Sequence, residues 1–174
     1  SVLRRDKGHV RDRLPVLIAT GSSEGIAQRG GAFFLQLALT GGGIEAESAV
    51  APRIVTTTDL ARERLTDYAC VILSDISEMD SRVTARIDRY VEGGGGLLLF
   101  SAPDIDAAAC NAALASTTPG RSSVIPAILS EPRFAEGNSG FKVHAADVDH
   151  PVLRELLTDM DLSGFRIQAL TTVS

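Results

Sequence analysis

The stretch "IDRYVEGGGGLLLFSAPDID", residues 87–106, carries the signals that decide the fold. It joins the end of an amphipathic helical pattern to an apolar run at 96–102, with glycines between them. A phosphate-binding loop must follow a strand and open a helix, so that backbone N–H groups face the anion. Gly93 to Gly96 do the reverse, because they close a helix and open a strand. We therefore predict a helix stop and tight turn, followed by a strand buried on both faces.

The same alternation runs along the chain. Apolar or β-branched runs predict strands at 14–21, 51–59, 68–76 and 96–102, then at 141–147 and 164–173. Helical patterns lie between them, at 30–43, 59–67, 80–96, 104–116, 124–129 and 149–158. Strands alternating with helices predict an α/β fold, a three-layer doubly wound arrangement around a mostly parallel sheet.

Within the expected helices, particular side chains define faces and ends. Phe33, Phe34, Leu37 and Ala38 share one face of the helix over 30–43. Over 80–96, the apolar positions are Val83, Ile87, Tyr90 and Val91, at helical spacing. Asp59 is the expected N-cap of the short helix over 59–67, and Asp80 or Ser81 that of the helix over 80–96.

Composition restricts the function classes. The chain has 174 residues, 44% apolar, with a net charge of −5 and no basic stripe, so we expect no nucleic-acid partner. No apolar run approaches the roughly 18 residues that span a bilayer, so contact with a membrane is expected only through segments outside this chain. The basic stretch 1–13 is expected to be a lead-in or linker, and 14–174 a single domain. Cys70 and Cys110 predict no disulfide framework, and no cofactor is expected.

In parallel α/β sheets, ligands bind beyond the carboxyl ends of the strands, here 20–25, 74–79 and 101–106. Polar side chains gather at these ends. Our ligand-binding candidates are Ser22, Ser23, Asp75, Ser101, Asp104 and Asp106. With Glu78 and Asp80, the acids could instead hold a divalent cation or serve as helix caps, and capping is the commoner role. The loop over 20–31, "TGSSEGIAQRGG", matches neither phosphate-binding signature.

Ser101 occupies the place of a hydrolase nucleophile at the end of a strand. A nucleophile there needs small neighbours, as in G-x-S-x-G, but Phe100 and Pro103 stand in this sequence. We expect Ser101 to cap the next helix; if the domain is an enzyme, its base is His144 or His150. A metal set of His144, Asp147, Asp149 and His150 has no recognised spacing.

The order of motifs resembles the class I glutamine amidotransferase-like fold, a flavodoxin-like architecture. The most telling strings are "YACVILSD", "YVEGGGGLLLF" and "HPVL", and the resemblance covers about residues 14–174. The chain is most similar to the version embedded in bacterial aerotolerance (Bat-type) membrane proteins, which often carry a von Willebrand A-like domain. The chain departs from the catalytic pattern: Ser101 stands near the position of the family's nucleophilic cysteine, and Val152 follows His150-Pro151 in place of glutamate.

These departures imply a degenerate, non-catalytic domain that binds a protein partner, other domains of its own protein or a ligand. The resemblance also implies a parent protein anchored in a bacterial inner membrane, with this segment soluble. Two alternatives stay open at this point. One is a hydrolase-like enzyme that uses Ser101. The other is a sugar- or metal-binding domain similar to trehalose-utilisation proteins, which would use Asp75, Asp104 and Asp106.

Overall fold

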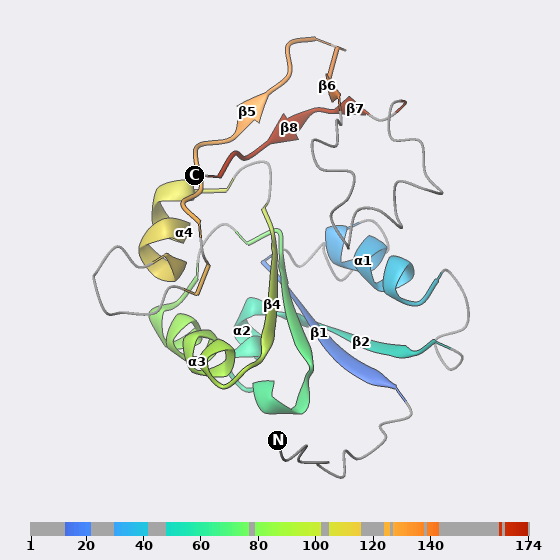
Figure 1. Cartoon of the computed structure of the whole chain (residues 1–174), viewed down its shortest axis with the longest axis vertical. Helices are drawn as coiled ribbons and strands as arrows, with labels where there is room; N and C mark the ends of the chain where they lie inside the picture. Colours follow the sequence, from blue (N-terminus) through green and yellow to red (C-terminus); the bar gives the residue numbers. More distant parts are fainter. Residues whose placement is uncertain are drawn as a thin grey trace, which may run out of the picture.

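A four-stranded parallel sheet forms the centre of the protein in the computed structural model (Figure 1). The strands are β1 (Leu14–Thr20), β2 (Val50–Thr56), β3 (Cys70–Ser74) and β4 (Gly96–Phe100), in the order β2-β1-β3-β4. The structure describes residues 13–21, 30–41, 48–76, 79–101, 105–115, 124–125, 127–137, 139–142, 164 and 166–173. The four main strands and their parallel pairing confirm the predicted α/β fold.

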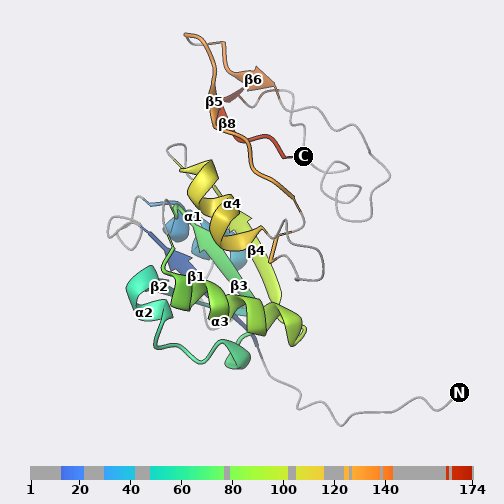
Figure 2. The ribbon, with the colours of Figure 1, turned by 90° about the vertical axis from the view of Figure 1, so that its left-hand side faces the viewer.

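Helices cover the two faces of the sheet (Figure 2). α1 (Gly31–Leu39) lies on one face, where Ala32 packs with Val16, Ile18 and Ile72. The other face carries α2 (Thr57–Leu60), α3 (Ser81–Glu92) and α4 (Ala107–Leu114). The main core lies under these three helices, and its largest fully buried side chains include Leu17, Leu60, Leu73 and Ile87. The strands read as continuous apolar runs in the sequence, because their side chains face helices on both sides of the sheet.

The run of four glycines is the helix stop that the sequence predicts. α3 ends at Glu92, Gly93 is its C-cap, and Gly94 has φ 91°, in the left-handed region that glycine tolerates best. Gly95 allows a close approach, because a Cβ there would lie 2.2–2.5 Å from ring carbons of Tyr90. The predicted buried side of α3 is also confirmed, and the Asp80 side chain caps its start by accepting from Arg82 N–H at 2.7 Å.

The apolar face noted for α1 is not the one that packs on the sheet. Its contacts with the sheet come from Ala32, Leu35 and Leu39, while Phe34 and Leu37 are exposed. The small side chain of Ala32 packs among β-branched side chains of the sheet such as Val16 and Ile18, and it is the buried residue of the helix. The bulky Phe33–Phe34 pair, an edge-to-face contact with ring centroids 5.7 Å apart, lies away from that contact.

β4 is also less buried than its apolar run predicts. Leu97 and Leu99 pack on the main core, but Leu98 and Phe100 on the other face are 51% and 47% exposed. β4 is the last strand of the four-stranded sheet, and α1 packs over β1 and β2 instead. An uninterrupted apolar run therefore does not require cover on both faces.

Two predicted helices differ in the structure. α2 begins after Thr56, whose hydroxyl accepts from the Asp59 N–H at 3.1 Å, so Thr56 is the N-cap in place of Asp59. α2 stops at Leu60, and a separate 3-10 turn, η3, follows at Leu65–Asp67. The helix predicted over 124–129 is wrong for the residues described there, since Leu129 instead forms an isolated bridge with Val173.

The described residues after Leu129 include two small antiparallel ribbons. β5 (Arg133–Phe134) pairs with β8 (Ala169–Leu170), and β6 (Phe141–Lys142) pairs with β7 (Arg166–Ile167). The single strand predicted over 164–173 is thus two short strands interrupted at Gln168. Both views place the ribbons beyond α4 and β4, at the top of each picture (Figures 1 and 2).

The side chain of Asn111 ties these ribbons to the sheet domain. From α4, its amide donates to the Leu129 carbonyl and its carbonyl accepts from the Leu129 N–H, both at 2.8 Å. We expect Asn111→Ala to lower the free energy of unfolding by about 2 kcal/mol, since two partly buried hydrogen bonds are lost. Chemical denaturation measures this loss. Asn111→Asp keeps the acceptor for the Leu129 N–H but places a carboxylate oxygen against the Leu129 carbonyl, so it should cost at least as much as the alanine variant. Equal stability of all three proteins would contradict the role of Asn111.

Candidate functional site

Open parallel sheets hold ligands at the point where the strand order reverses, and here that point lies at the carboxyl ends of β1 and β3. This position is called the crevice below. The chain leaves β1 toward β2 on one side, whereas β3 lies on the other side of β1. The connections therefore diverge between β1 and β3, which is where open parallel sheets hold ligands. The strand ends are held together there, because the Gly21 N–H donates to the Ser74 carbonyl at 3.3 Å.

Asp75 stands in this crevice, directly after β3. With φ 53°, it is the non-glycine residue with left-handed backbone geometry among the described residues. This conformation costs most side chains about 1 kcal/mol, although aspartate tolerates it better than most. Such strain concentrates at ligand and active sites, where the surrounding structure maintains it.

Two glycines make room for Asp75. A Cβ on Gly21 would lie 2.4 Å from the Asp75 backbone oxygen, and a Cβ on Gly31 would lie 2.6 Å from the carboxylate Oδ2. Gly31 is the first residue of α1, so the Asp75 carboxylate lies at the amino end of that helix. The helix dipole favours a negative charge at this end. The carboxylate of the chain itself thus occupies the position at which a bound anion would be expected.

The Asp75 side chain is oriented by Ser74, whose side chain is buried within β3. The Ser74 hydroxyl donates to Asp75 Oδ2 at 3.2 Å, and Ser74 is only 2% exposed. Oδ1 accepts no hydrogen bond from another described residue. Asp75 itself is partly exposed, so Oδ1 can accept hydrogen bonds from a ligand.

The other described candidates have different surroundings. Ser101 is exposed, and its hydroxyl donates to the Thr171 hydroxyl at 3.4 Å, a long contact that joins β4 to the C-terminal segment. The expectation that Ser101 caps the next helix is wrong, because the N-cap of α4 is Asp106, which accepts from the Ala109 N–H at 2.8 Å. Asp106 is thereby engaged as a helix cap.

Several predicted site residues lie outside the described residues: Ser22, Ser23, Glu78, Asp104, His144, Asp147, Asp149 and His150. Within the part of the chain that the structure describes, no group of three histidine, cysteine or acidic side chains converges on a metal position. Of the six ligand-binding candidates, Asp75 is therefore the described residue that combines strain, close packing and a free acceptor atom.

Neither cysteine has the surroundings of an activated thiol. Burial raises the pKa of Cys70. Burial also raises the pKa of Cys110, and the nearby negative charge of Asp106 raises it further. A nucleophilic cysteine needs a lowered pKa, so that the thiolate is present at neutral pH. Both thiols thus remain protonated and act in packing, with Cys70 against the α1 side of the sheet and Cys110 against the main core.

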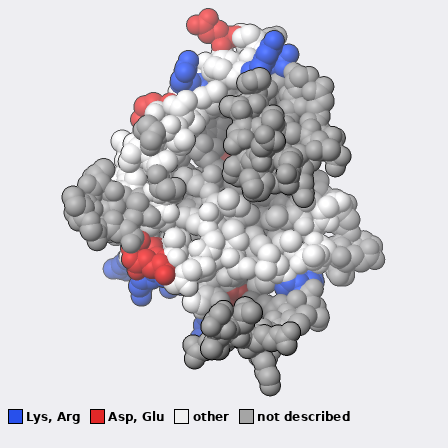
Figure 3. Space-filling view, viewed as in Figure 1, with Lys and Arg blue, Asp and Glu red and all other residues white. Residues whose placement is uncertain are grey.

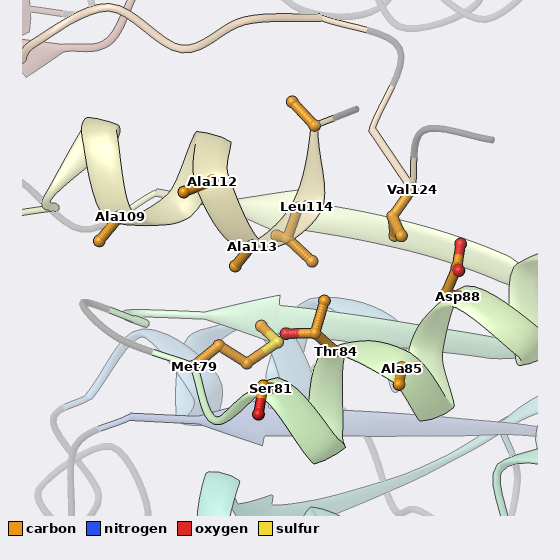
Figure 4. A pocket seen from close by; sticks show the side chains of 11 residues that line it. Met79, Ser81, Thr84, Ala85, Asp88, Ala109, Ala112, Ala113, Leu114 and Val124 are labelled. Carbon is orange, nitrogen blue, oxygen red and sulfur yellow. The ribbon is translucent and has the colours of Figure 1, made fainter. Parts of the chain in front are cut away.

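A second hollow lies between α3 and α4 (Figure 4). Its volume is about 360 Å³, and its wall from α4 consists largely of alanines such as Ala109, Ala112 and Ala113. Ser81, Thr84 and Asp88 provide polar atoms on the α3 side. Sequence reasoning missed this hollow; its signal is the alanine-rich run 107–115, whose small side chains leave space beside α3.

Charge is distributed unevenly over the face shown in Figure 3. Most of the described residues at its centre are uncharged, and the larger groups of acidic and basic atoms lie toward the rim. Apart from this view, α1 carries the exposed apolar residues Phe34 and Leu37, and β4 carries Leu98 and Phe100. No helix among the described residues has the length and apolar character to cross a membrane.

Comparisons with protein-family models, curated proteins and solved structures give no match to this chain.

Proposed function

We propose that the chain is a non-catalytic, amidotransferase-like binding domain that holds a small ligand in the crevice between β1 and β3. One observation carries the proposal: Asp75 is kept in a left-handed conformation, against two glycines and a buried serine, at the strand ends. A surface turn has no need of this arrangement, because glycine or asparagine would fill it with less strain.

The proposed flavodoxin-like architecture rests on the strand order and on helices packed against both faces of the sheet. The strand order reverses direction between β1 and β3, as in doubly wound domains that bind ligands at this point. A parent protein anchored in a bacterial membrane remains part of the proposal and is supported by the motif order of the sequence.

The chemistry of the crevice favours a ligand that donates hydrogen bonds. Asp75 Oδ2 already places a negative charge at the amino end of α1, so a phosphate or carboxylate there would face repulsion. Oδ1 is an acceptor, which suits a hydroxyl or ammonium group. We therefore propose a neutral polyol or an amine as the ligand class, in agreement with a sugar-binding rather than a nucleotide-binding site.

Substitution of Asp75 by asparagine tests the proposal. Glucose and glutamine serve as probes in thermal-shift and calorimetric titrations, with inorganic phosphate as the anionic comparison. We expect glucose or glutamine to stabilise the wild-type chain, by about 2.7 kcal/mol at a hundredfold excess over Kd. Asp75→Asn keeps the shape and tolerates the left-handed backbone, so it should fold normally but lose at least about tenfold in affinity.

Asp106→Asn is the matched control, since asparagine caps a helix as well as aspartate does. This variant should keep both the stability and the affinity of the wild type. Equal binding of glucose or glutamine by the wild type and by Asp75→Asn would refute the assignment. Phosphate counts against it only if Asp75→Asn changes the affinity for phosphate, because that would place the anion at Asp75. If no probe stabilises the wild-type chain, the ligand classes proposed for this crevice are wrong.

The runner-up function, a serine hydrolase, has less support. The hydrogen-bond partner of Ser101 is Thr171, and a threonine hydroxyl cannot act as the general base that the mechanism needs. The two candidate bases, His144 and His150, lie outside the described residues. The binding proposal is preferred because it rests on contacts within the described crevice.

A further inference from the structure

A basic hollow lies at the end of the sheet opposite the Asp75 crevice. η3 precedes the amino end of β3, and the last turns of α3 lead through the glycines to the amino end of β4; η3 and α3 pack together. Between them is a space of about 300 Å³, within the lower range of small-molecule sites. Its lining comprises Arg64, Leu65, Thr66, Arg86, Arg89 and Tyr90.

Half of this lining is arginine, in a chain whose net charge is −5. None of the three guanidinium groups forms an ion pair with a carboxylate of the described residues. Three acids are adjacent in sequence to the lining: Glu63, Asp67 and Asp88. The Glu63 carboxylate pairs with Arg53 at 2.8 Å and accepts from the Tyr68 hydroxyl at 2.9 Å. Asp88 lines the other hollow, between α3 and α4, and Asp67 does not line this one. The positive charge of the hollow is therefore uncompensated by these carboxylates.

One hydrogen-bond donor of the Arg86 side chain has no acceptor among the described residues. Its Nη2 donates to the Glu63 backbone carbonyl, but its Nε–H is buried without an acceptor within the described part of the chain. A buried donor without a partner costs about 1–3 kcal/mol. The Tyr90 side chain beside it is held in place, because it is only 7% exposed and its hydroxyl donates to the Tyr68 carbonyl at 3.2 Å. An oxyanion that draws Arg86 toward the hollow would supply the missing acceptor.

We propose that this hollow binds the phosphate group of a small soluble molecule. The guanidinium fork matches phosphate and carboxylate oxygens equally in geometry. Charge favours phosphate over carboxylate. A phosphate monoester carries a charge of about −1.5 to −2 at neutral pH, which balances more of the positive charge of three arginines than the single charge of a carboxylate does. The Thr66 hydroxyl adds a neutral donor to the same wall. This site is independent of the ligand proposed for Asp75 and lies away from it.

Calorimetric titration of the whole chain at low ionic strength tests the proposal, with inorganic phosphate, glycerol 2-phosphate and acetate as probes. We expect both phosphates to bind at least about tenfold more tightly than acetate. Arg86→Gln and Arg89→Gln should each weaken phosphate binding by about tenfold or more. Arg62→Gln is the matched control, because Arg62 is exposed, pairs with Asp59 and does not line the hollow.

Circular dichroism establishes that each variant is folded before titration. Arg89→Gln keeps the test decisive if Arg86→Gln is unstable, since Arg89 is exposed and its only described side-chain bond joins its Nε to the Ala85 carbonyl. An equal loss of affinity in Arg62→Gln would overturn the proposal by showing general charge attraction. The absence of phosphate binding to the wild type at about 10 mM would do the same. Binding to vesicles containing phosphatidate, without binding to either soluble phosphate, would also overturn it.

Discussion

Replacing Leu73 with alanine should lower the free energy of unfolding by about 3 kcal/mol. Leu73 is fully buried in β3, between β1 and β4, and its side chain belongs to the core beneath α3. The change removes apolar contacts and leaves a cavity that a close-packed sheet cannot fill by relaxation. Urea denaturation followed by circular dichroism measures the change as a shift in the midpoint.

Leu98→Ala is the matched control, because the same side chain is removed from the neighbouring strand at a position 51% exposed. It should cost well under half as much as Leu73→Ala, since far less apolar surface is returned to water. Equal losses for the two variants would mean that the outer face of β4 is covered in solution.

Gly95→Ala should lower the free energy of unfolding by about 2 kcal/mol, although only one methyl group is added. The new Cβ would lie 2.2–2.5 Å from three ring carbons of Tyr90, so the ring or the turn must move. The ring cannot move freely, because its hydroxyl is bonded to the Tyr68 carbonyl and Tyr90 is buried. The substitution therefore disturbs the junction of α3 and β4.

A double-mutant cycle isolates this contact. In a Tyr90→Leu background, where the ring is gone, Gly95→Ala should cost less than about 0.5 kcal/mol. Gly164→Ala is a control for the glycine-to-alanine change itself, since a Cβ there meets nothing within 4 Å. If Gly95→Ala costs the same in both backgrounds, the backbone of the turn, not the ring, is responsible.

The sequence predicts the features that depend on local pattern. Apolar runs mark β1, β3 and β4, helical spacing marks the buried side of α3, and Asp80 and Gly93–Gly95 mark where α3 begins and ends. These signals are local because hydrogen bonding, capping and side-chain periodicity act within a few residues.

The features that were missed depend on residues far apart in the chain. The exposed side of β4 follows from the position of α1 over other strands, and the role of Asn111 follows from its contact with Leu129. The left-handed conformation of Asp75 is accommodated by Gly21 and Gly31, which approach from the end of β1 and the start of α1. The basic hollow likewise joins residues 64–66 to residues 86–90. A single sequence carries no local signal for contacts between residues that are far apart in the chain.

The position of β1 between β2 and β3 has a kinetic consequence. β1 is synthesised before both of its partners, and the β3 pairing joins Val16 to Cys70. Each pairing closes a long loop, and the chain loses this entropy before the strands gain their contacts. Folding of parallel sheets is slow for this reason. Until Cys70–Ser74 has emerged from the ribosome, the apolar side chains of β1 lack their central neighbour. The nascent chain is then most exposed to aggregation, and expression yield should respond to synthesis speed more than stability alone indicates.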